Sequence, residues 1–394
     1  MKSLMQKYNV KCYEEDFTTL DIINDFVKNK ETEEAFFIID LGEVQKAYKN
    51  WCSLLPNVKP YYAIKCNPNQ AIVETLSLLG ANFDCASKNE IEQVLKLTND
   101  PSRIIYANPC KAISHIKYAH DNGVNMMTFD CEEELYKIQK YHPNAQAVIR
   151  IAVDDSQSVC RFNEKFGCHL DEVENLLHIA KSRSINVIGI SFHVGSGCKS
   201  PKSFYNALVD TKKAYDIAKS IGFDFTIIDI GGGFHGDNYG SFVEISQNIN
   251  DAIKELFHDI RDIQFIAEPG RYFCQSSHTL VLNVIGNKVR YEEDNNMKFI
   301  YYLNDGIYGS FNCIFFDHYL PVILPIKARG SERYNSVVYG PSCDCIDRIC
   351  NDIMLPELFV GDWVYVEKFG AYTSAASSNF NGFKTTIIKY ICKF

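Results

Sequence analysis

The sequence lacks an apolar stretch of 18 residues without charged or polar breaks, so it predicts no transmembrane helix. Basic residues are also in deficit, because 40 Lys and Arg stand against 49 Asp and Glu and give a net charge of -9. A chain with this charge is a poor general binder of nucleic acid, since such binding depends on neutralising phosphates. The N-terminal 17 residues turn acidic where a secretory signal needs an apolar core.

Metal and nucleotide motifs are missing as well. The 15 cysteines are scattered, and the close pair Cys343 and Cys345 lacks the second pair of ligands that a zinc site needs. We therefore predict no metal site and expect reduced, mostly buried thiols in a cytoplasmic protein. The sequence has no G-x-G-x-x-G motif, which disfavours a dinucleotide site, and no G-K-[ST], which excludes a nucleotide P-loop.

What the sequence does contain is a regular alternation of apolar runs and helical segments. The runs are rich in Val, Ile, Phe and Tyr and occupy residues 60–66, 82–87, 103–109, 126–130, 147–153, 187–195, 225–233 and 265–271. Helical spacing lies between them, as in residues 69–80 and 203–222, each of which ends on Gly. Eight such units predict an α/β fold with a closed (β/α)₈ barrel. A doubly wound open sheet is the alternative, and the number of units favours the barrel.

The remainder of the chain has strand patterns almost throughout. Runs at 278–291, 297–306, 333–343, 361–370 and 383–394 predict an antiparallel β domain, interrupted by a short helix around 345–352. We expect residues 1–34 to be the N-terminal part of that domain, 35–271 to form the barrel and 272–394 to complete the β domain. The strand pattern at 35–42 precedes the eight barrel units and could instead pack on the β domain.

Polar residues follow the predicted barrel strands, at the end where barrel enzymes have their active sites. They are Lys65, Asp84, Asn108, Arg150, His193, Ser196, Gly231 to Gly233, Glu268 and Arg271. A lysine at the end of an apolar strand is costly to bury unless it is paired or used. Lys65 therefore indicates either a salt bridge inside the barrel or an amine that forms an imine.

The glycine run 231–233 adds a second kind of signal. Glycines at a strand end let backbone N–H groups approach a phosphate closely, although a tight turn is the simpler explanation. Arg271 could bind the same phosphate, and Glu268 supplies a carboxylate nearby. A cofactor with a phosphate, a carbonyl and a basic ring nitrogen would use these groups together with Lys65, and pyridoxal phosphate fits that description.

Seven motifs resemble, in order, those of the fold-type III, pyridoxal-phosphate-dependent basic amino acid decarboxylases, most closely their eukaryotic ornithine-specific branch. They are YAIKCNP, FDCAS, SFHVGSG, DIGGGF, AEPGRY, GPSCDCID and GAYTSAASSNFNGF. The resemblance covers nearly the whole chain. It implies a barrel of the alanine racemase type, a C-terminal β domain and a head-to-tail homodimer with shared active sites. It also implies decarboxylation of L-ornithine to putrescine and CO₂, the first step of polyamine biosynthesis.

The resemblance assigns roles to single residues. Lys65 would hold pyridoxal phosphate as an imine, His193 would stack on its ring, and Glu268 would face the ring nitrogen. Cys343 would reach in from the other subunit. The other cofactor-binding positions that it implies are Asp84, Arg150, Ser196, Gly232, Gly233, Pro269, Gly270, Arg271 and Tyr372. The substrate-binding positions that it implies are Phe316, Asp317, Asp344 and Phe380.

The chemistry of decarboxylation agrees with these roles. Loss of CO₂ leaves a carbanion whose charge an imine and a pyridinium can absorb, and Glu268 would keep the ring nitrogen protonated. The negative charge of Asp344 favours the neutral thiol that Cys343 needs as a proton donor. Asp317 and Asp344 provide two carboxylates for one ammonium, so we expect a cationic substrate end.

Other activities stay open at this point. Diaminopimelate would be repelled by Asp317 and Asp344, and arginine-specific relatives are usually much longer. Lysine is longer than ornithine by one methylene, a difference worth only ~1–3 kcal/mol, so some turnover of lysine is expected. A non-catalytic regulator similar to antizyme inhibitor is the hypothesis from another class, and the presence of Lys65, Glu268 and Cys343 speaks against it. Control by antizyme through residues 110–142 stays undecided.

Two positions depart from the family pattern. Phe316 stands where the family often has Tyr, and His235 stands where it usually has Pro. Neither change removes a charged catalytic group. We therefore expect them to alter affinity and to leave the reaction in place.

Overall fold

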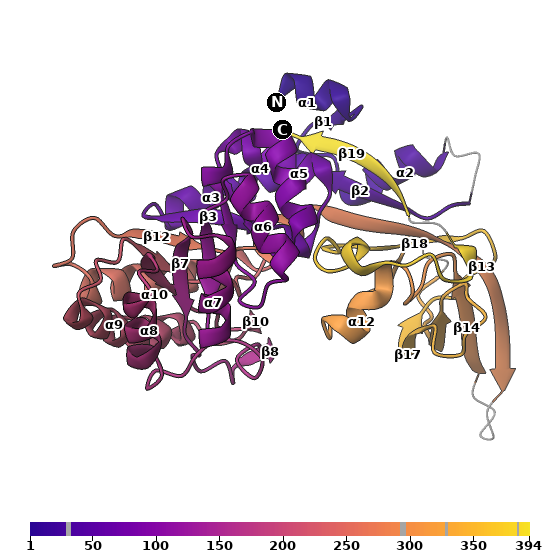
Figure 1. Ribbon diagram of the computed structural model, residues 1–394. Helices are drawn as coiled ribbons and strands as arrows, with labels where there is room; N and C mark the ends of the chain where they lie inside the picture. Colours follow the sequence, from indigo (N-terminus) through magenta and orange to yellow (C-terminus); the bar gives the residue numbers. More distant parts are fainter. Residues whose placement is uncertain (29–32, 292–296, 328–329, 384–385) are drawn as a thin grey trace. The chain divides into compact units, whose positions relative to one another are not determined.

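The chain folds into two units, one of which combines both ends of the sequence (Figure 1). The computed structural model describes residues 1–28, 33–291, 297–327, 330–383 and 386–394. The barrel unit is Gln45–Phe273, and the β unit joins Met1–Val44 to Cys274–Phe394. The boundary expected after residue 34 differs from the observed one because strand β2 (Phe36–Asp40) pairs with strands of the β unit.

Eight parallel strands close into a barrel in the order β11-β12-β3-β4-β5-β6-β7-β9. Each overlaps one of the eight predicted runs, so the closed barrel is confirmed and the open sheet is excluded. The strands are β3 (Val58–Ala63), β4 (Asn82–Cys85), β5 (Ile104–Tyr106), β6 (Met126–Phe129), β7 (Gln146–Arg150), β9 (Val187–Ser191), β11 (Ile227–Asp229) and β12 (Gln264–Ala267).

Helices lie around the outside of these strands in Figure 1. Asn69 begins α4 by accepting hydrogen bonds from the N–H groups of Ala71 and Ile72, and Gly80 ends it in the left-handed conformation. This confirms the helix predicted at 69–80, and α9 confirms the one at 203–222. The helices are α3 (Leu41–Leu54), α4 (Gln70–Leu79), α5 (Lys88–Thr98), α6 (Ile113–Asp121), α7 (Glu132–Tyr141), α8 (Val173–Ser182), α9 (Lys202–Ile221), α10 (Tyr239–Leu256) and α11 (Arg271–Cys274).

The barrel interior changes from apolar to polar along the strands. Ile227 and Ile266 belong to the apolar cluster that fills it. Side chains two residues apart on a strand point to the same face. Asp229 and Glu268 therefore also face the interior, at the carboxyl ends of neighbouring strands. This polar layer holds the residues predicted to carry the chemistry.

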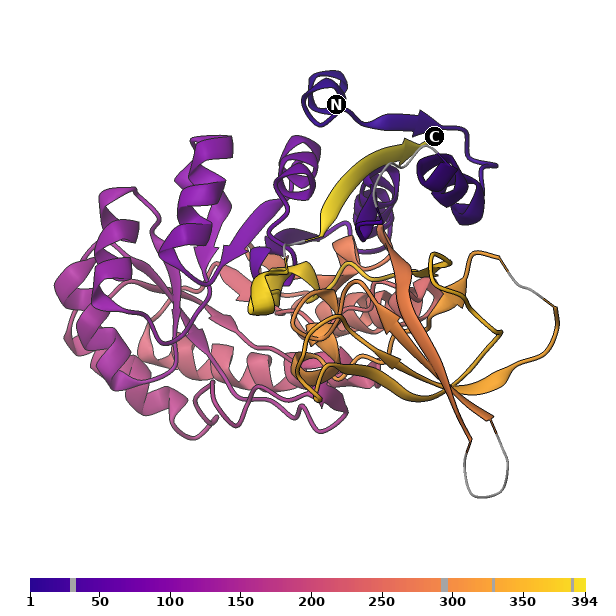
Figure 2. The ribbon, with the colours of Figure 1, turned by 90° about the vertical axis from the view of Figure 1, so that its right-hand side faces the viewer.

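The β unit contains a nine-stranded sheet, whose main order is β1-β19-β2-β13-β14-β16-β17. Figure 2 shows β19, in yellow, following indigo β1 at the edge of the unit. The sheet is mostly antiparallel, as predicted, although β19 runs parallel to β1 and β2, and β14 runs parallel to β16. No hairpin joins these pairs, so no turn forces them to be antiparallel. The strands are β1 (Lys11–Tyr13), β2, β13 (His278–Tyr291), β14 (Met297–Leu303), β15 (Leu324–Pro325), β16 (Tyr334–Tyr339), β17 (Arg348–Leu355), β18 (Trp363–Val366) and β19 (Ile387–Lys393).

The helix predicted around 345–352 is replaced by strand β17. Ile349 and Leu355 are buried while Arg348 and Asp352 are exposed, and the strand pairs antiparallel with β16. Cross-strand pairing therefore overrides the local helical pattern. The helices of this unit are α1 (Lys2–Lys7), α2 (Thr19–Lys28) and α12 (Cys313–Phe316). Of the strand predicted at 383–394, residues 384 and 385 lie outside the described ranges.

The sequence also made predictions about buried thiols and about membrane-spanning helices. All 15 cysteines are free, and seven of them are buried, so the expectation of mostly buried thiols is wrong. Within the ranges given above, no helix has both the length and the apolar composition needed to cross a bilayer. The cytoplasmic location expected from the sequence stays a prediction.

Candidate active site

An amine and a buried carboxylate meet at the ends of strands β3 and β4. Lys65 lies in the short 3₁₀ turn Ile64–Cys66 that follows β3, and Asp84 lies on β4 beside Ala63. The Lys65 Nζ is 2.6 Å from the Asp84 Oδ2. Asp84 is 1% exposed, whereas the Lys65 side chain is 39% exposed. The carboxylate therefore holds an amine that a ligand can still reach.

The glycines after β11 pack too closely against their surroundings to carry side chains. A Cβ on Gly231 would lie 2.1 Å from the carbonyl oxygen of Phe192. A Cβ on Gly232 would lie 2.8 Å from both the Glu268 carbonyl oxygen and the His193 Nε2. Gly231 and Gly233 also adopt positive φ, at +64° and +107°, which favours glycine. The bare backbone forms a close-fitting cradle beside His193 and Glu268.

The Ser196 hydroxyl and the Arg271 guanidinium form a second polar pair in the barrel unit. Arg271 begins α11, and Ser196 begins the short strand β10 (Ser196–Cys198), which pairs with β8 (Ser158–Cys160). The Arg271 Nη2 donates to the Ser196 Oγ over 3.1 Å. The turn that carries Arg271 is fixed against β3, because the Ala63 N–H donates to the Pro269 carbonyl and Gly270 packs on Cys66. Arginine, hydroxyl and close-packed glycines are a donor set suited to phosphate.

His193 is buried and uncharged. Its Nδ1 accepts a hydrogen bond from the Gly195 N–H over 2.9 Å, so the neutral ring carries its proton on Nε2. Burial lowers the pKa of His193 well below its usual value, and the charges of Arg150 and Lys65 lower it further. Phe162 contacts the ring edge-on, with 4.9 Å between centroids. The imidazole is therefore a fixed, neutral aromatic surface next to the glycine cradle.

Glu268 faces a second carboxyl that the sequence reading did not single out. Burial raises the pKa of Glu268 well above its usual value, and the charges of Asp229 and Asp84 add to the effect. Burial likewise raises the pKa of Asp229 to about 7. The signal for Asp229 was present in the sequence, since it is an acid at the end of an apolar strand, as Lys65 is a base at such a position.

Several buried polar atoms of this layer have no hydrogen-bond partner in the described part of the chain. Arg150, on β7, is 9% exposed, and burial lowers its pKa while the charge of Glu268 opposes that effect. Buried polar atoms are almost always hydrogen-bonded in folded proteins. The layer therefore fits a polar ligand. The unpartnered atoms are Asp84 Oδ1, Thr128 Oγ1, Arg150 Nε and Nη2, Ser191 Oγ and Asp229 Oδ2.

The β unit brings three of the predicted residues and two unpredicted ones into one cluster. The Asp344 Oδ2 accepts a hydrogen bond from the Tyr308 hydroxyl over 2.6 Å, which lowers the pKa of Asp344. Phe380 stacks on Tyr308 with 4.1 Å between ring centroids. The backbone N–H of the exposed Cys343 donates to the Asn381 side chain over 3.1 Å. Tyr308 and Asn381 thus hold the segment that carries the thiol and the carboxylate.

The remaining predicted residues lie in two other loops of the β unit. Asp317 ends α12 and is buried, whereas the preceding Phe316 is 71% exposed. Tyr372 is half-buried and has a positive φ of +55°, which is unusual for a residue other than glycine. His235, the other departure from the family pattern, places its Nε2 2.7 Å from the Cys198 carbonyl in the barrel unit.

The predicted residues therefore form two sets, one in each unit. The barrel unit brings together Lys65 with Asp84, Ser196 with Arg271, and Gly232 with His193 and Glu268, as described above. The β unit holds Cys343, Asp344 and Phe380, with Asp317 and Tyr372 in separate loops. In the described ranges, no group of three His, Cys, Asp or Glu side chains is arranged to hold a metal ion.

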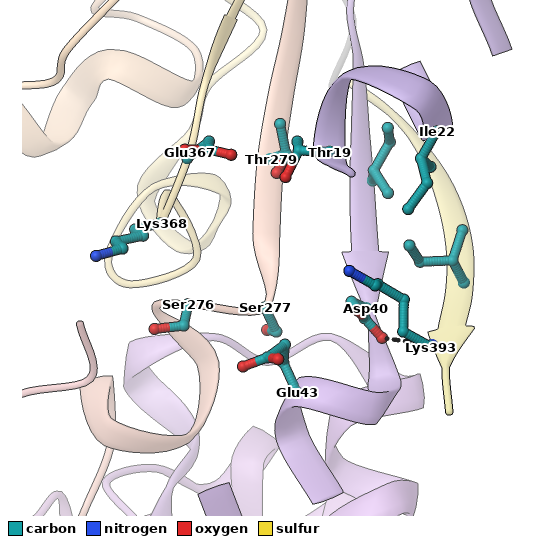
Figure 3. A pocket seen from close by; sticks show the side chains of 12 residues that line it. Thr19, Ile22, Asp40, Glu43, Ser276, Ser277, Thr279, Glu367, Lys368 and Lys393 are labelled. Atoms are coloured by element: carbon teal, nitrogen blue, oxygen red, sulfur yellow. Dashed lines mark hydrogen bonds between the residues drawn. The ribbon is translucent and has the colours of Figure 1, made fainter. Parts of the chain in front are cut away.

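A pocket elsewhere in the β unit contains none of these residues (Figure 3). It encloses about 270 Å³ and is lined by carboxylates and lysines together, including Asp40, Glu43, Glu367, Lys368 and Lys393. The Asp40 Oδ1 accepts the backbone N–H groups of Gly42 and Lys393, over 2.8 and 3.3 Å. Asp40 thus ties β2 to β19, and we regard the pocket as part of the packing of the sheet.

Comparison with known proteins gives the family. The pyridoxal binding domain of pyridoxal-dependent decarboxylases matches residues 41–275. The chain is 45% identical over 402 residues to ornithine decarboxylase of Rattus norvegicus, covering 98% of this chain and 87% of that protein. It is 46% identical over 404 residues to antizyme inhibitor 2 of Xenopus laevis, covering 99% and 89%.

A solved structure agrees with this assignment. The arginine decarboxylase of Paramecium bursaria Chlorella virus superposes with a TM-score of 0.90 at 38% identity, covering 95% of this chain and 100% of that one. The fold, the motifs and the sequence similarity thus indicate the same family over nearly the full length of the chain. The chain belongs to the pyridoxal-dependent decarboxylase family.

Proposed function

We propose that the protein decarboxylates L-ornithine to putrescine and CO₂. The observation that carries the proposal is the polar layer of the barrel, which presents an accessible amine on Lys65, the Ser196–Arg271 pair and Glu268 at one end of the strands. Relatives named ornithine decarboxylase match almost the whole chain at 45% identity. The Asp317 and Asp344 carboxylates of the β unit suit the distal ammonium of a basic amino acid.

The residues of the barrel unit fit pyridoxal phosphate. When bound, this cofactor supplies a carbonyl that combines with amines and a ring that accepts the electrons left by departing CO₂. Lys65 is the amine that anchors it, while Ser196 and Arg271, with the close-packed Gly232 and Gly233 and with Tyr372, would hold its phosphate. Neutral His193 offers a flat surface for the ring. Glu268 would ionise beside a cationic ring nitrogen, because an opposite charge offsets the cost of burial.

Proton delivery would come from the β unit. Cys343 would donate a proton to the substrate Cα, and its neighbour Asp344 stays ionised because Tyr308 stabilises the carboxylate. Phe316 and Phe380 would line the path of the substrate side chain. In the proposed homodimer, Lys65 of one subunit works with the partner subunit's Cys343 and Asp344.

Two alternatives have specific support. The arginine decarboxylase above is covered over 100% of its length by this chain, so chain length does not exclude arginine, contrary to the expectation from the sequence. The similarity to antizyme inhibitor 2 supports a regulatory role as the second alternative function. The Lys65–Asp84 pair, the Ser196–Arg271 pair and the buried Glu268 favour an enzyme, since a regulator needs none of them.

The test is a CO₂-release assay with ornithine, lysine and arginine side by side, together with the visible absorbance of the bound cofactor. We expect ornithine to react fastest and lysine more slowly. Fastest release from arginine would move the assignment to that substrate. Absence of both CO₂ release and cofactor absorbance would favour the regulator.

The homodimer is tested by mixing Lys65→Ala with Cys343→Ala and measuring diamine formation, which neither protein should carry out at the normal rate by itself. A mixed dimer regains one site with both wild-type groups, so activity should partly return. Tagged subunits show whether exchange has occurred. If exchanged subunits recover no activity, the sites are not shared between subunits.

A further inference from the structure

Asp229 lies in the polar layer and has no role in the chemistry proposed above. We propose that Asp229 is a positioning residue that shares a proton with Glu268 and thereby sets the charge that Glu268 presents to the cofactor ring nitrogen. This inference rests on the proposed function and deepens it. It follows from backbone register, from the hydrogen bonds of the two carboxyls and from the charge of the layer.

The backbone fixes the two carboxyls as neighbours. Strands β11 and β12 pair in parallel, with Asp229 opposite Ile266. Beyond the paired residues, the Ile230 N–H donates to the Ile266 carbonyl over 2.9 Å, and the Glu268 N–H donates to the Gly231 carbonyl over 2.7 Å. Both side chains point into the barrel where the strands end, and Glu268 lies two residues beyond the residue opposite Asp229.

The hydrogen bonds of Asp229 leave one of its carboxyl oxygens available for a shared proton. The Asp229 Oδ1 accepts the Gly231 N–H over 2.9 Å, which fixes the carboxyl plane. Its buried Oδ2 has no N–H or hydroxyl partner in the described residues. Asp229 and Glu268 are close enough for each carboxyl to shift the pKa of the other. Ionised carboxylates only accept hydrogen bonds, so a bond between them requires one of them to be protonated.

The charge of the layer leads to the same conclusion. Asp84, Asp229 and Glu268 are three carboxyls, and Lys65 and Arg150 are two cations, so one retained proton makes the layer neutral. Burial favours the neutral form of both members of the pair, as their raised pKa values indicate. The other titratable groups near the pair are Tyr61 on β3, Asp84 on β4, Lys65 after β3, Arg150 on β7 and neutral His193 after β9, with Asp130 acting on Arg150.

A cationic ring nitrogen beside Glu268 would take the place of the shared proton. The pair would then lose its proton to solvent, and the Glu268 carboxylate would face the N–H⁺ of the ring. Asp229 would thus keep Glu268 neutral until a cation arrives, and would afterwards add a second negative charge that stabilises that cation. In this step the O–H bond of the protonated carboxyl breaks and its proton forms a new O–H bond with water, while no other covalent bond changes.

The test counts protons released when cofactor-free protein binds pyridoxal phosphate, followed with a pH indicator dye. Asp229→Asn keeps an oxygen for the Gly231 N–H and removes one titrating carboxyl. We expect it to release fewer protons than wild type, by up to about one per site. Asp305→Asn is the matched control, because burial also raises the pKa of Asp305, which lies in the β unit. This control should release as many protons as wild type, and equal release by Asp229→Asn would overturn the inference.

A double-variant cycle distinguishes the proposed action of Asp229 through Glu268 from a merely structural role. If Asp229 acts through Glu268, then Asp229→Asn should weaken cofactor binding by about tenfold in the wild-type background and by less than about twofold in Glu268→Gln. Equal losses in both backgrounds would mean that Asp229 only supports the glycine loop, which overturns the proposal.

A third measurement needs no change at position 229. Proton release by wild type should fall as the pH rises through about 7, the pKa of Asp229, and Glu268→Gln should lose most of that dependence. The same pH profile in both proteins would overturn the inference. Wild-type protein that binds no pyridoxal phosphate would instead refute the proposed function, and this is visible before any variant is compared.

Discussion

Replacing Gly232 by alanine places a methyl group inside the cofactor cradle. The added Cβ would lie 2.8 Å from the Glu268 carbonyl oxygen and 2.8 Å from the His193 Nε2. Gly232 does not have the positive φ of its two glycine neighbours, so alanine is compatible with its backbone conformation. The perturbation is therefore steric, and it acts on two residues expected to contact the cofactor.

The size of the effect follows from overpacking. Forcing an extra methyl into a packed site costs about 1–3 kcal/mol. Expressed in cofactor affinity, this corresponds to a dissociation constant about 5-fold to 150-fold higher. Because the Glu268 carbonyl is backbone, it cannot rotate away as a flexible side chain would. We expect the loss in cofactor affinity to exceed the loss in fold stability.

Cofactor affinity is measured by absorbance titration, and fold stability by thermal unfolding of the cofactor-free protein. Gly240→Ala is a matched control, because its Cβ would lie 3.5 Å from the nearest atom, an oxygen of Asn238, within helix α10. It should leave binding unchanged and stabilise the fold by about 0.5–1 kcal/mol. Gly231→Ala, at 2.1 Å from a carbonyl and with a φ of +64°, should damage the fold itself. Normal cofactor affinity in Gly232→Ala would refute the assignment of the cradle.

Three further predictions concern single side chains. Lys65→Ala should keep the Ser196–Arg271 pair but lose the amine that anchors the cofactor. Cofactor absorbance should therefore weaken, and CO₂ release should fall by orders of magnitude. Normal absorbance together with normal CO₂ release would contradict the role of Lys65. Cys343→Ala should still release CO₂ but deliver the proton to the cofactor C4′, giving an aldehyde and pyridoxamine phosphate, whereas clean diamine at the normal rate would exclude Cys343 as donor. Burial lowers the pKa of His278 to about 3, whereas this histidine in the unfolded chain titrates near 6.5. Below about pH 6.5 the unfolded state therefore binds a proton that the folded state does not. The free energy of unfolding should fall by ~1.4 kcal/mol for each pH unit in this range. His278→Asn should flatten this acid dependence of chemical unfolding, and an unchanged slope would show that another group is responsible.

The barrel and the candidate site positions at the ends of its strands could be predicted from local sequence patterns. Each βα unit is local, because a buried strand, a turn and a helix ended by glycine are all encoded within about 30 residues. Gly80 and Gly222 end their helices, as the sequence predicted, and both adopt the left-handed conformation. Lys65 and the glycine run were recognisable for the same reason, since a charged or bare residue at the end of an apolar strand departs from the local pattern.

The pairing of distant segments could not be predicted from such local patterns. Strand β17 has a local pattern compatible with a helix, and its pairing with β16 makes it a strand. Strand β19 pairs with β1 and β2 from the other end of the chain, and no local signal encodes that partner. The same holds for Asp229 and Glu268, which lie 39 positions apart in sequence and meet because β11 and β12 are neighbours in the barrel. Contacts of this kind depend on register between strands, which the residues of one strand do not specify.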